Sequence, residues 1–256
     1  MNDTAIRILA AESGKTHLFF IGQAGFVIKS KSGQLLGFDL CLSECVERVE
    51  GHMGFKRLIP KVLDPFELRF DVLVATHPHF DHFDMDAIPQ MMSNHHTRLF
   101  ASVNCEAEVK RLMMTGENTE YVRPGDSADC CGFHIDFVDC DHGKGAPDAV
   151  GAVITVDGMK IYMAGDTCLR MDRVEKLKGY GKLDVVIGPI NGAFGNMNEE
   201  EFADFSHALG SRLTIPCHYG MFATHGGHPG RFLEIMKEKY PDDRALLMCL
   251  GEGIIL

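Results

Sequence analysis

Five side chains that can bind a divalent metal ion lie within the nine residues 76–84, T-H-P-H-F-D-H-F-D. They are His77, His79, Asp81, His82 and Asp84. Imidazole and carboxylate ligands together suit zinc, and also manganese and iron. Because His77 and His79 are two residues apart, an extended segment points them the same way, while Asp81 and His82 turn to another side. The stretch therefore predicts one loop that supplies ligands to two adjacent metal ions.

A purely structural role is the alternative for this cluster, because a single histidine in a loop is usually solvated or hydrogen-bonded. Three histidines and an aspartate within the six residues 77–82 are harder to explain in that way. Unpaired polar groups at the end of a buried strand cost desolvation free energy unless something binds them. Asp84 is interpreted as the cap of the helix that follows rather than as a fifth ligand.

Buried strands are predicted to position the ligands. Residues 71–75 are apolar and β-branched, so the histidine loop starts where a core strand ends. Three later residues of ligand type also follow predicted strands: His142 follows 133–138, Asp166 follows the hairpin 150–164, and His218 follows 213–215. The hairpin is indicated by its Asp-Gly turn. Since strand ends at one edge of a sheet are neighbours in space, we expect these residues to meet the loop at one point.

The remaining pattern alternates strands and helices. Residues 17–21, 24–28 and 34–39 predict an antiparallel meander. Asp39, at its exit, either caps a turn or orients a metal-binding histidine. Residues 41–53 are expected to form a short helix or a lid over the site. Further strands are predicted at 99–102, 184–190 and 244–249, and helices at 84–94, 104–114, 170–178, 198–209 and 230–239.

Composition excludes several classes of protein. The chain has 256 residues, 45% of them hydrophobic, and a net charge of −11, which disfavours a nucleic-acid backbone as partner. No apolar run approaches 18 residues, so no membrane span is expected. The nine cysteines are scattered and form no C-x-x-C pair, so we expect reduced thiols. Residues 1–16 show no secretory signal, and together these features predict a cytoplasmic protein. We expect residues 1–256 to form a single domain.

An ordered set of motifs resembles the metallo-β-lactamase-fold hydrolases. The set is H-P-H-F-D-H (77–82), an isolated histidine after a strand (142), G-D-T (165–167) and P-C-H-Y-G (216–220). Three stretches are most similar to the L-ascorbate-6-phosphate lactonase branch: D-P-F-E-L-R-F-D-V-L-V-A-T-H (64–77), residues 57–60, and the glycine-containing loop after Asn191.

The resemblance implies an α/β fold, the four-layer αββα sandwich, with the site at one edge between two sheets. It implies one metal ion at His77, His79 and His142, a second at Asp81, His82 and His218, and Asp166 between them. Manganese or zinc is expected, and iron also fits the ligands. The implied activity is hydrolysis of a small, anionic substrate, such as a sugar-acid lactone phosphate, by a hydroxide that bridges the two ions. Asp81 either transfers a proton or is only a ligand.

The loop after His218 supplies further candidates. Tyr219, His225 or His228 could donate a hydrogen bond to an oxyanion or to a substrate phosphate. The alternative is surface histidines on a flexible loop, whose glycines 226 and 227 let it move. In the loop after the strand 184–190, Asn191 and Asn196 are candidate substrate contacts, whereas Asn198 with Glu201 predicts a helix cap.

Two other functions remain open at this point. One is a phosphodiesterase or nuclease of the same fold, which the net charge disfavours for long nucleic acids. The other is a non-hydrolytic metal-binding or redox protein. Flavodiiron proteins use this fold, but 256 residues leave no room for their flavodoxin domain. We expect a small-molecule substrate as the main partner, and a homo-oligomer is compatible with the sequence.

Overall fold

The computed structural model describes residues 1–256, and in it the strand before the histidine loop, β4 (Val72–Ala75), is buried on both faces. Val72 and Val74 pack into one hydrophobic cluster, and Leu73 and Ala75 pack into another. A strand with two buried faces is apolar at every position, which explains why this segment shows no alternation. Layers of structure must therefore cover it on both sides.

The strands form two sheets. The strands are β1 (His17–Gly22), β2 (Gly25–Lys29), β3 (Leu35–Phe38), β4, β5 (Arg98–Ser102), β6 (Thr119–Val122), β7 (Ser127–Cys130), β8 (Phe133–Asp139), β9 (Val150–Val156), β10 (Met159–Met163), β11 (Val185–Pro189), β12 (Leu213–Cys217) and β13 (Gly253–Ile255). A seven-stranded sheet has the order β13-β1-β2-β3-β4-β5-β6, and a six-stranded sheet has the order β12-β11-β10-β9-β8-β7. The predicted meander of β1, β2 and β3 is antiparallel, as expected.

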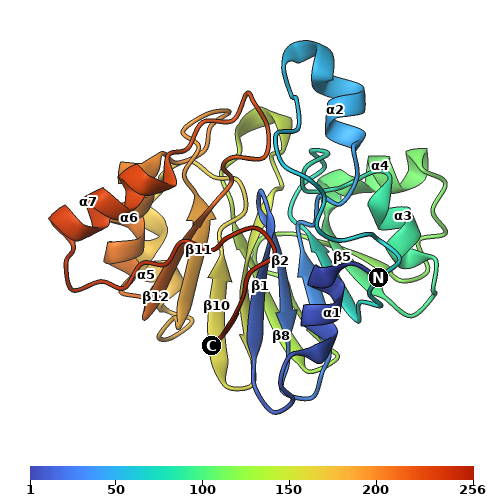
Figure 1. Cartoon of the computed structure of the whole chain (residues 1–256), viewed down its shortest axis with the longest axis horizontal. Coiled ribbons are helices and arrows are strands. Elements are labelled where there is room, and N and C mark those ends of the chain that lie inside the picture. Colours follow the sequence, from blue (N-terminus) through green and yellow to red (C-terminus); the bar gives the residue numbers. More distant parts are fainter.

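Helices cover the outer face of each sheet. They are α1 (Asp3–Ala10), α2 (Cys45–Glu50), α3 (Ala87–Met92), α4 (Glu106–Arg111), α5 (Val174–Lys178), α6 (Glu199–Leu209) and α7 (Pro229–Lys239), with short 3₁₀ helices η1 (Gly51–Met53), η2 (Val103–Cys105), η3 (Gly143–Gly145) and η4 (Met171–Arg173). In Figure 1, α1, α3 and α4 lie on one side of the two sheets and α5, α6 and α7 on the other. No helix is both long and apolar enough to cross a membrane.

Three hydrophobic clusters correspond to the three contacts between these layers. The largest, of 25 buried residues, takes side chains from both sheets and so lies between them. A second joins the seven-stranded sheet to α1, α3 and α4, and a third joins the six-stranded sheet to α5, α6 and α7. The four-layer αββα sandwich expected from the sequence is confirmed.

Strand direction brings the chemically active residues to one edge. β3 and β4 are parallel, so the residues that follow them, Asp39 and Thr76, are neighbours. In the other sheet β10, β11 and β12 are parallel, and β8 runs the same way because each of β8 and β10 is antiparallel to β9. The loops that carry His142, Asp166 and His218 therefore leave the sheet at a common edge.

Several local predictions were wrong. Residues 244–249 do not form a strand, because they pair with β12 only at the bridge between Ala245 and Thr214, and the last strand is β13. The polar strands β6 and β7 at the sheet edges, and the helix α1, were not predicted. The helix expected from 104 begins at Glu106, and the Asn104 side chain accepts a hydrogen bond from the Asp148 N–H instead.

A buried lysine ends helix α1. Lys29 Nζ donates to the carbonyl oxygens of Ile8, Leu9 and Ala11 at 2.9, 2.8 and 3.1 Å, which have no partner within the helix. Positive charge at a helix C-terminus also interacts favourably with the helix dipole. Lys29→Met keeps the chain length but loses all three bonds. We expect it to destabilise the fold by about 2 kcal/mol, seen as a fall of roughly 4–8 °C in Tm by differential scanning calorimetry.

An unchanged Tm in Lys29→Met would show that the carbonyl groups find other partners. Lys31→Met is the matched control, because Lys31 is exposed and its side chain makes none of these bonds.

Candidate metal centre

Three histidines bring their ring nitrogens together at the first part of the site. His77 Nε2 lies 2.9 Å from His79 Nδ1, which lies 3.1 Å from His142 Nε2. Nitrogen ligands about 2.0–2.1 Å from a tetrahedral zinc ion are roughly 3.3 Å apart. The three atoms are therefore spaced nearly as a metal ion requires. His77 and His79 come from the loop after β4, and His142 comes from the loop after β8.

A second group lies beside the first. His82 Nε2 and His218 Nε2 are 3.3 Å apart, and Asp81 Oδ2 lies 3.3 Å from His218 Nε2 and 3.6 Å from His82 Nε2. This group joins the histidine loop to the residue that follows β12. It offers two imidazoles and a carboxylate, a set that also suits a divalent metal ion.

Asp166 lies between the two groups. Its Oδ1 is 3.1 Å from His218 Nε2 and 3.2 Å from His82 Nε2, and its Oδ2 is 3.8 Å from His142 Nε2. Oδ1 is buried and accepts no hydrogen bond. A buried carboxylate oxygen without a partner is costly unless a cation satisfies it. The residues present thus fit two metal ions that share Asp166.

The charges of these groups are balanced among themselves. Burial lowers the pKa of His142 to about 4 and also lowers those of His77 and His79, so these rings are neutral, the form that binds metals. Burial opposes charge on His218, but Asp166 and Asp81 raise its pKa to about 9. The two carboxylates therefore favour positive charge at this position, which a divalent cation would also provide.

A buried carboxylate holds one of the rings in place. Asp39 Oδ2 lies 2.7 Å from His82 Nδ1, and Asp39 also accepts hydrogen bonds from the N–H and the hydroxyl of Thr76. With Nδ1 bonded to the carboxylate, His82 Nε2 is free to face the site. Of the two roles expected for Asp39, the contact with His82 corresponds to orienting a histidine.

Two amide side chains hold carboxylates of the site, a role that was predicted for neither of them. Gln23 Nε2 donates to Asp81 Oδ2 at 2.8 Å, and Asn196 Nδ2 donates to Asp166 Oδ2 at 2.8 Å. Asn196 was a candidate substrate contact, and in the structure its Nδ2 binds a carboxylate. Gln23 sits in the turn between β1 and β2 with a φ of 55°, a position that suggests only a hairpin. Nothing in the local sequence separates these amides from ordinary loop residues.

The three candidates after His218 have different surroundings. His225 Nε2 lies 4.0 Å from Asp81 Oδ2, and its ring is 4.9 Å from that of His218. Burial lowers the pKa of His225 to about 4. Tyr219 packs 6.1 Å from the ring of Phe20, and its hydroxyl makes no hydrogen bond to any residue of the two groups. His228 is exposed and precedes α7.

The glycines of this loop allow close packing. A Cβ at Gly226 would lie 2.7 Å from the Asn191 carbonyl oxygen, and one at Gly227 would lie 2.8 Å from Tyr219 Cβ. The loop is thus pressed against the segment after β11, whereas the sequence suggested that these glycines let it move. Asn198 caps α6 with a complete capping box, as predicted.

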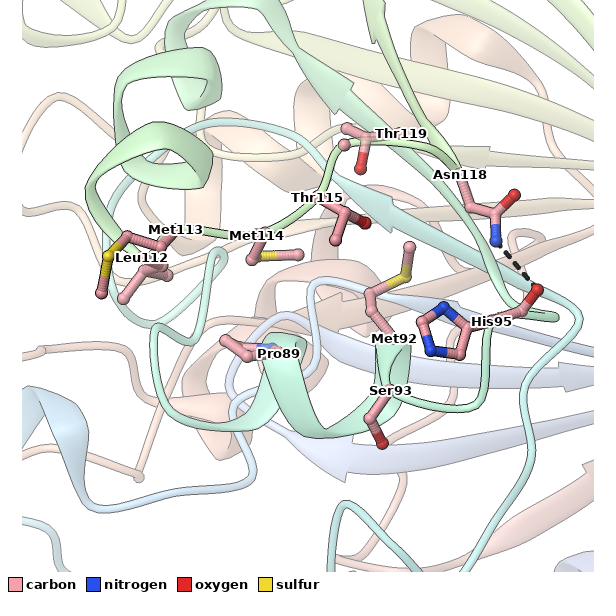
Figure 2. A pocket seen from close by; sticks show the side chains of 11 residues that line it. Pro89, Met92, Ser93, His95, Leu112, Met113, Met114, Thr115, Asn118 and Thr119 are labelled. Atoms are coloured by element: carbon pink, nitrogen blue, oxygen red, sulfur yellow. Dashed lines mark hydrogen bonds between the residues drawn. The ribbon is translucent and has the colours of Figure 1, made fainter.

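A cavity of about 220 Å³ lies elsewhere, between α3 and the segment after α4. Figure 2 shows Met92, Met114 and His95 around it, with the Asn118 amide donating to the His95 carbonyl. It shares no residue with the two groups and has no carboxylate in its lining. The chemistry of the molecule is therefore concentrated at the histidine–aspartate cluster.

Comparisons with known proteins agree with this assignment. Residues 17–218 match the beta-lactamase superfamily domain. A UPF0173 metal-dependent hydrolase of Korarchaeum cryptofilum is 32% identical over 167 residues, 64% of this chain and 71% of the relative. One from Saccharolobus solfataricus is 27% identical over 186 residues, 71% of this chain and 80% of the relative. The structure of Igni18, a metallo hydrolase from Ignicoccus hospitalis, has a TM-score of 0.72 at 21% identity, covering 94% of this chain and 98% of its own.

The fold and the cluster of histidines and aspartates define a metal-dependent hydrolase of the metallo-β-lactamase fold. The chain belongs to the beta-lactamase superfamily and, within it, to the UPF0173 metal-dependent hydrolases.

Proposed function

We propose that His77, His79 and His142 hold one divalent metal ion, that Asp81, His82 and His218 hold a second, and that Asp166 binds both. The observation that carries this proposal is the division of the Asp166 oxygens, with Oδ1 near His82 and His218 and Oδ2 towards His142. Manganese and zinc are the favoured ions, and iron fits the same ligands.

The proposed reaction is hydrolysis of a small carbonyl substrate, with a lactone as the first candidate. Bound divalent ions would supply Lewis acidity and a hydroxide at neutral pH. Asp81, held by Gln23, keeps an ionised oxygen at the site, since His82 and His218 keep its pKa low against the effect of burial. Neutral His225, beside that oxygen, is placed to donate a hydrogen bond to charge developing on the substrate.

The first test is the metal itself. Protein purified without chelator should contain about two ions per chain. Removing two metal ions, each present at a concentration a hundredfold above its Kd, should lower Tm by roughly 10–20 °C, and adding back manganese or zinc should restore it. Elemental analysis and calorimetry measure both effects. Protein that holds no metal under any of these conditions would exclude the proposal.

The second test is the substrate class. Lactones and bis(p-nitrophenyl) phosphate are compared as substrates of the metal-loaded protein, with His77→Ala as the inactive variant. His228→Ala is the control, because His228 is exposed and lies outside the cluster. Lactone hydrolysis lost only in His77→Ala supports the proposal. Cleavage of the phosphodiester alone would replace it with a phosphodiesterase, and full activity in His77→Ala would reject the metal site.

A further inference from the structure

Phe194 combines two locally unfavourable features. Its side chain is 56% exposed, and its φ of 56° lies in the left-handed region. The Asn196 N–H donates to the Ala193 carbonyl, and Phe194 and Gly195 both have positive φ, which makes 193–196 a type I′ turn. That turn position favours asparagine, aspartate or glycine. A large apolar residue retained in such a conformation points to a function at this position.

Phe194 belongs to a group of aromatic rings drawn from three segments. Its ring centroid lies 5.6 Å from that of Phe55 and 5.3 Å from that of His225. Phe55 and the buried Phe222 each lie 5.5 Å from His225. Phe55 follows η1, Phe194 lies between β11 and α6, and Phe222 follows β12. Phe55 is partly exposed, so it and Phe194 are the members that present ring surface to solvent.

Backbone pairing fixes this arrangement. The Leu58 N–H donates to the Met221 carbonyl at 2.8 Å, and the Ala223 N–H donates to the Lys56 carbonyl at 2.9 Å. The segment after η1 is thereby bonded to the segment that carries Phe222 and His225. Phe55 lies over His225 because of this register, and the contact is built into the fold.

The aromatic group adjoins the proposed metal centre at two points. His225, which all three phenylalanines contact, has its Nε2 4.0 Å from Asp81 Oδ2. The turn that exposes Phe194 ends at Asn196, which donates to Asp166. A substrate whose reacting carbon is at the metal centre would therefore meet the rings of Phe55 and Phe194 next.

The carboxylates of the site and the lysine beside Phe55 are not arranged to bind an anionic group next to the aromatic rings. No lysine or arginine forms an ion pair with Asp81 or Asp166. Lys56, beside Phe55, is paired with Glu47 at 3.2 Å. Glu50, the last residue of α2, has a pKa that is raised by burial and by the negative charge of Asp81. Around His225 the side chains offered to a substrate are thus aromatic.

We infer that Phe55 and Phe194 form the specificity-determining surface of the site and bind an apolar or aromatic group attached to the carbonyl compound that is hydrolysed. This inference rests on the proposed function. It replaces the phosphate expected from the sequence with a hydrophobic substituent. Ring stacking and apolar burial supply the discrimination.

The inference is tested by the ratio of kcat/KM values for two lactones, one with a phenyl group and one without. Wild-type protein should prefer γ-phenyl-γ-butyrolactone over γ-butyrolactone in kcat/KM, and Phe194→Asn and Phe55→Ala should each lower that preference about tenfold. Phe66→Ala is the matched control, because Phe66 is 70% exposed and belongs to no such group. An unchanged preference in Phe194→Asn and Phe55→Ala would overturn the inference.

The stability of the Phe194→Asn variant also shows whether Phe194 serves substrate binding or folding. Because asparagine suits the turn, Phe194→Asn should raise Tm by about 2 °C while it lowers the substrate preference. A fall in Tm of several degrees together with equal losses on both lactones would assign Phe194 to folding and overturn the inference.

A binding measurement separates failure of the inference from failure of the proposed function. Saturation-transfer NMR on chelator-treated protein compares 3-phenylpropionamide with propionamide. The phenyl compound alone should give a signal, which should weaken in Phe194→Asn and Phe55→Ala and persist in Phe66→Ala. If wild-type protein hydrolyses neither lactone, the proposed lactonase activity fails and this comparison alone decides the inference. Equal signals from all variants would overturn it.

Discussion

Replacing Asp166 by asparagine is expected to lower hydrolysis by on the order of 10³ or more and to reduce bound metal below two ions per chain. Asp166 is the one residue whose oxygens approach both groups of ligands. An amide keeps its shape but removes a negative charge. Asp81 would then be the only carboxylate left among the proposed ligands of two divalent ions, and at most one ion should be held firmly. Elemental analysis and kinetics on the same preparation measure both effects.

Asp141→Asn is the control for this experiment. Asp141 directly precedes His142, but its carboxylate is partly exposed and pairs with Arg170 at 2.7 Å. Its replacement removes the same charge a short distance from the site without touching a ligand, so metal content should stay near two. A fully loaded, fully active Asp166→Asn variant would contradict the sharing of Asp166 between two ions.

The clustering of these histidines and aspartates could be predicted because strand ends are recognisable in the sequence. His77, Asp166 and His218 follow apolar runs of the length of a strand, and His142 follows an alternating one. Parallel strands bring such positions to one edge. Their residue types then limit the chemistry. The sequence pattern alone could not show which of these side chains lie together in each of the two groups. That division depends on how the two sheets pack against each other, and no local sequence feature reports this packing.

The supporting residues could not be predicted for the same reason. Gln23 reaches Asp81 across 58 positions of sequence, and Asn196 reaches Asp166 across 30. Glutamine and asparagine in turns are common, so their types are uninformative. Phe55 and Phe194 would ordinarily be assigned to the core, and only their exposure and the left-handed φ of Phe194 separate them from core residues.

The errors in the fold share a physical cause. β6 and β7 are edge strands with polar, partly exposed residues, so apolar periodicity cannot detect them. Residues 244–249 are partly apolar but lie beside β12, where a single bridge replaces a ladder. An apolar pattern in the sequence indicates that a segment is buried. Tertiary packing then decides whether that buried or half-buried segment forms a strand.

Asp39→Asn is expected to weaken metal binding by up to about 100-fold, although Asp39 is not a proposed ligand. Asp39 is fully buried and accepts from His82 Nδ1 at 2.7 Å. An asparagine that turns its amide nitrogen towards His82 would disturb the tautomer and orientation of that ring. Its Nε2 would then face the site less often in the form that binds a metal.

Asp84→Asn provides a matched comparison. Asp84 is equally buried, but it accepts hydrogen bonds from the N–H groups of Leu42, Ser43 and Ala87 and contacts no imidazole. Its replacement should cost roughly 2–3 kcal/mol of stability, since the amide cannot accept all of these bonds, while metal affinity stays unchanged. Isothermal titration with manganese or zinc and thermal unfolding of both variants separate the two effects. If Asp39→Asn lowers Tm and leaves metal affinity intact, Asp39 serves as a turn cap, and the orientation of His82 must come from the packing around it.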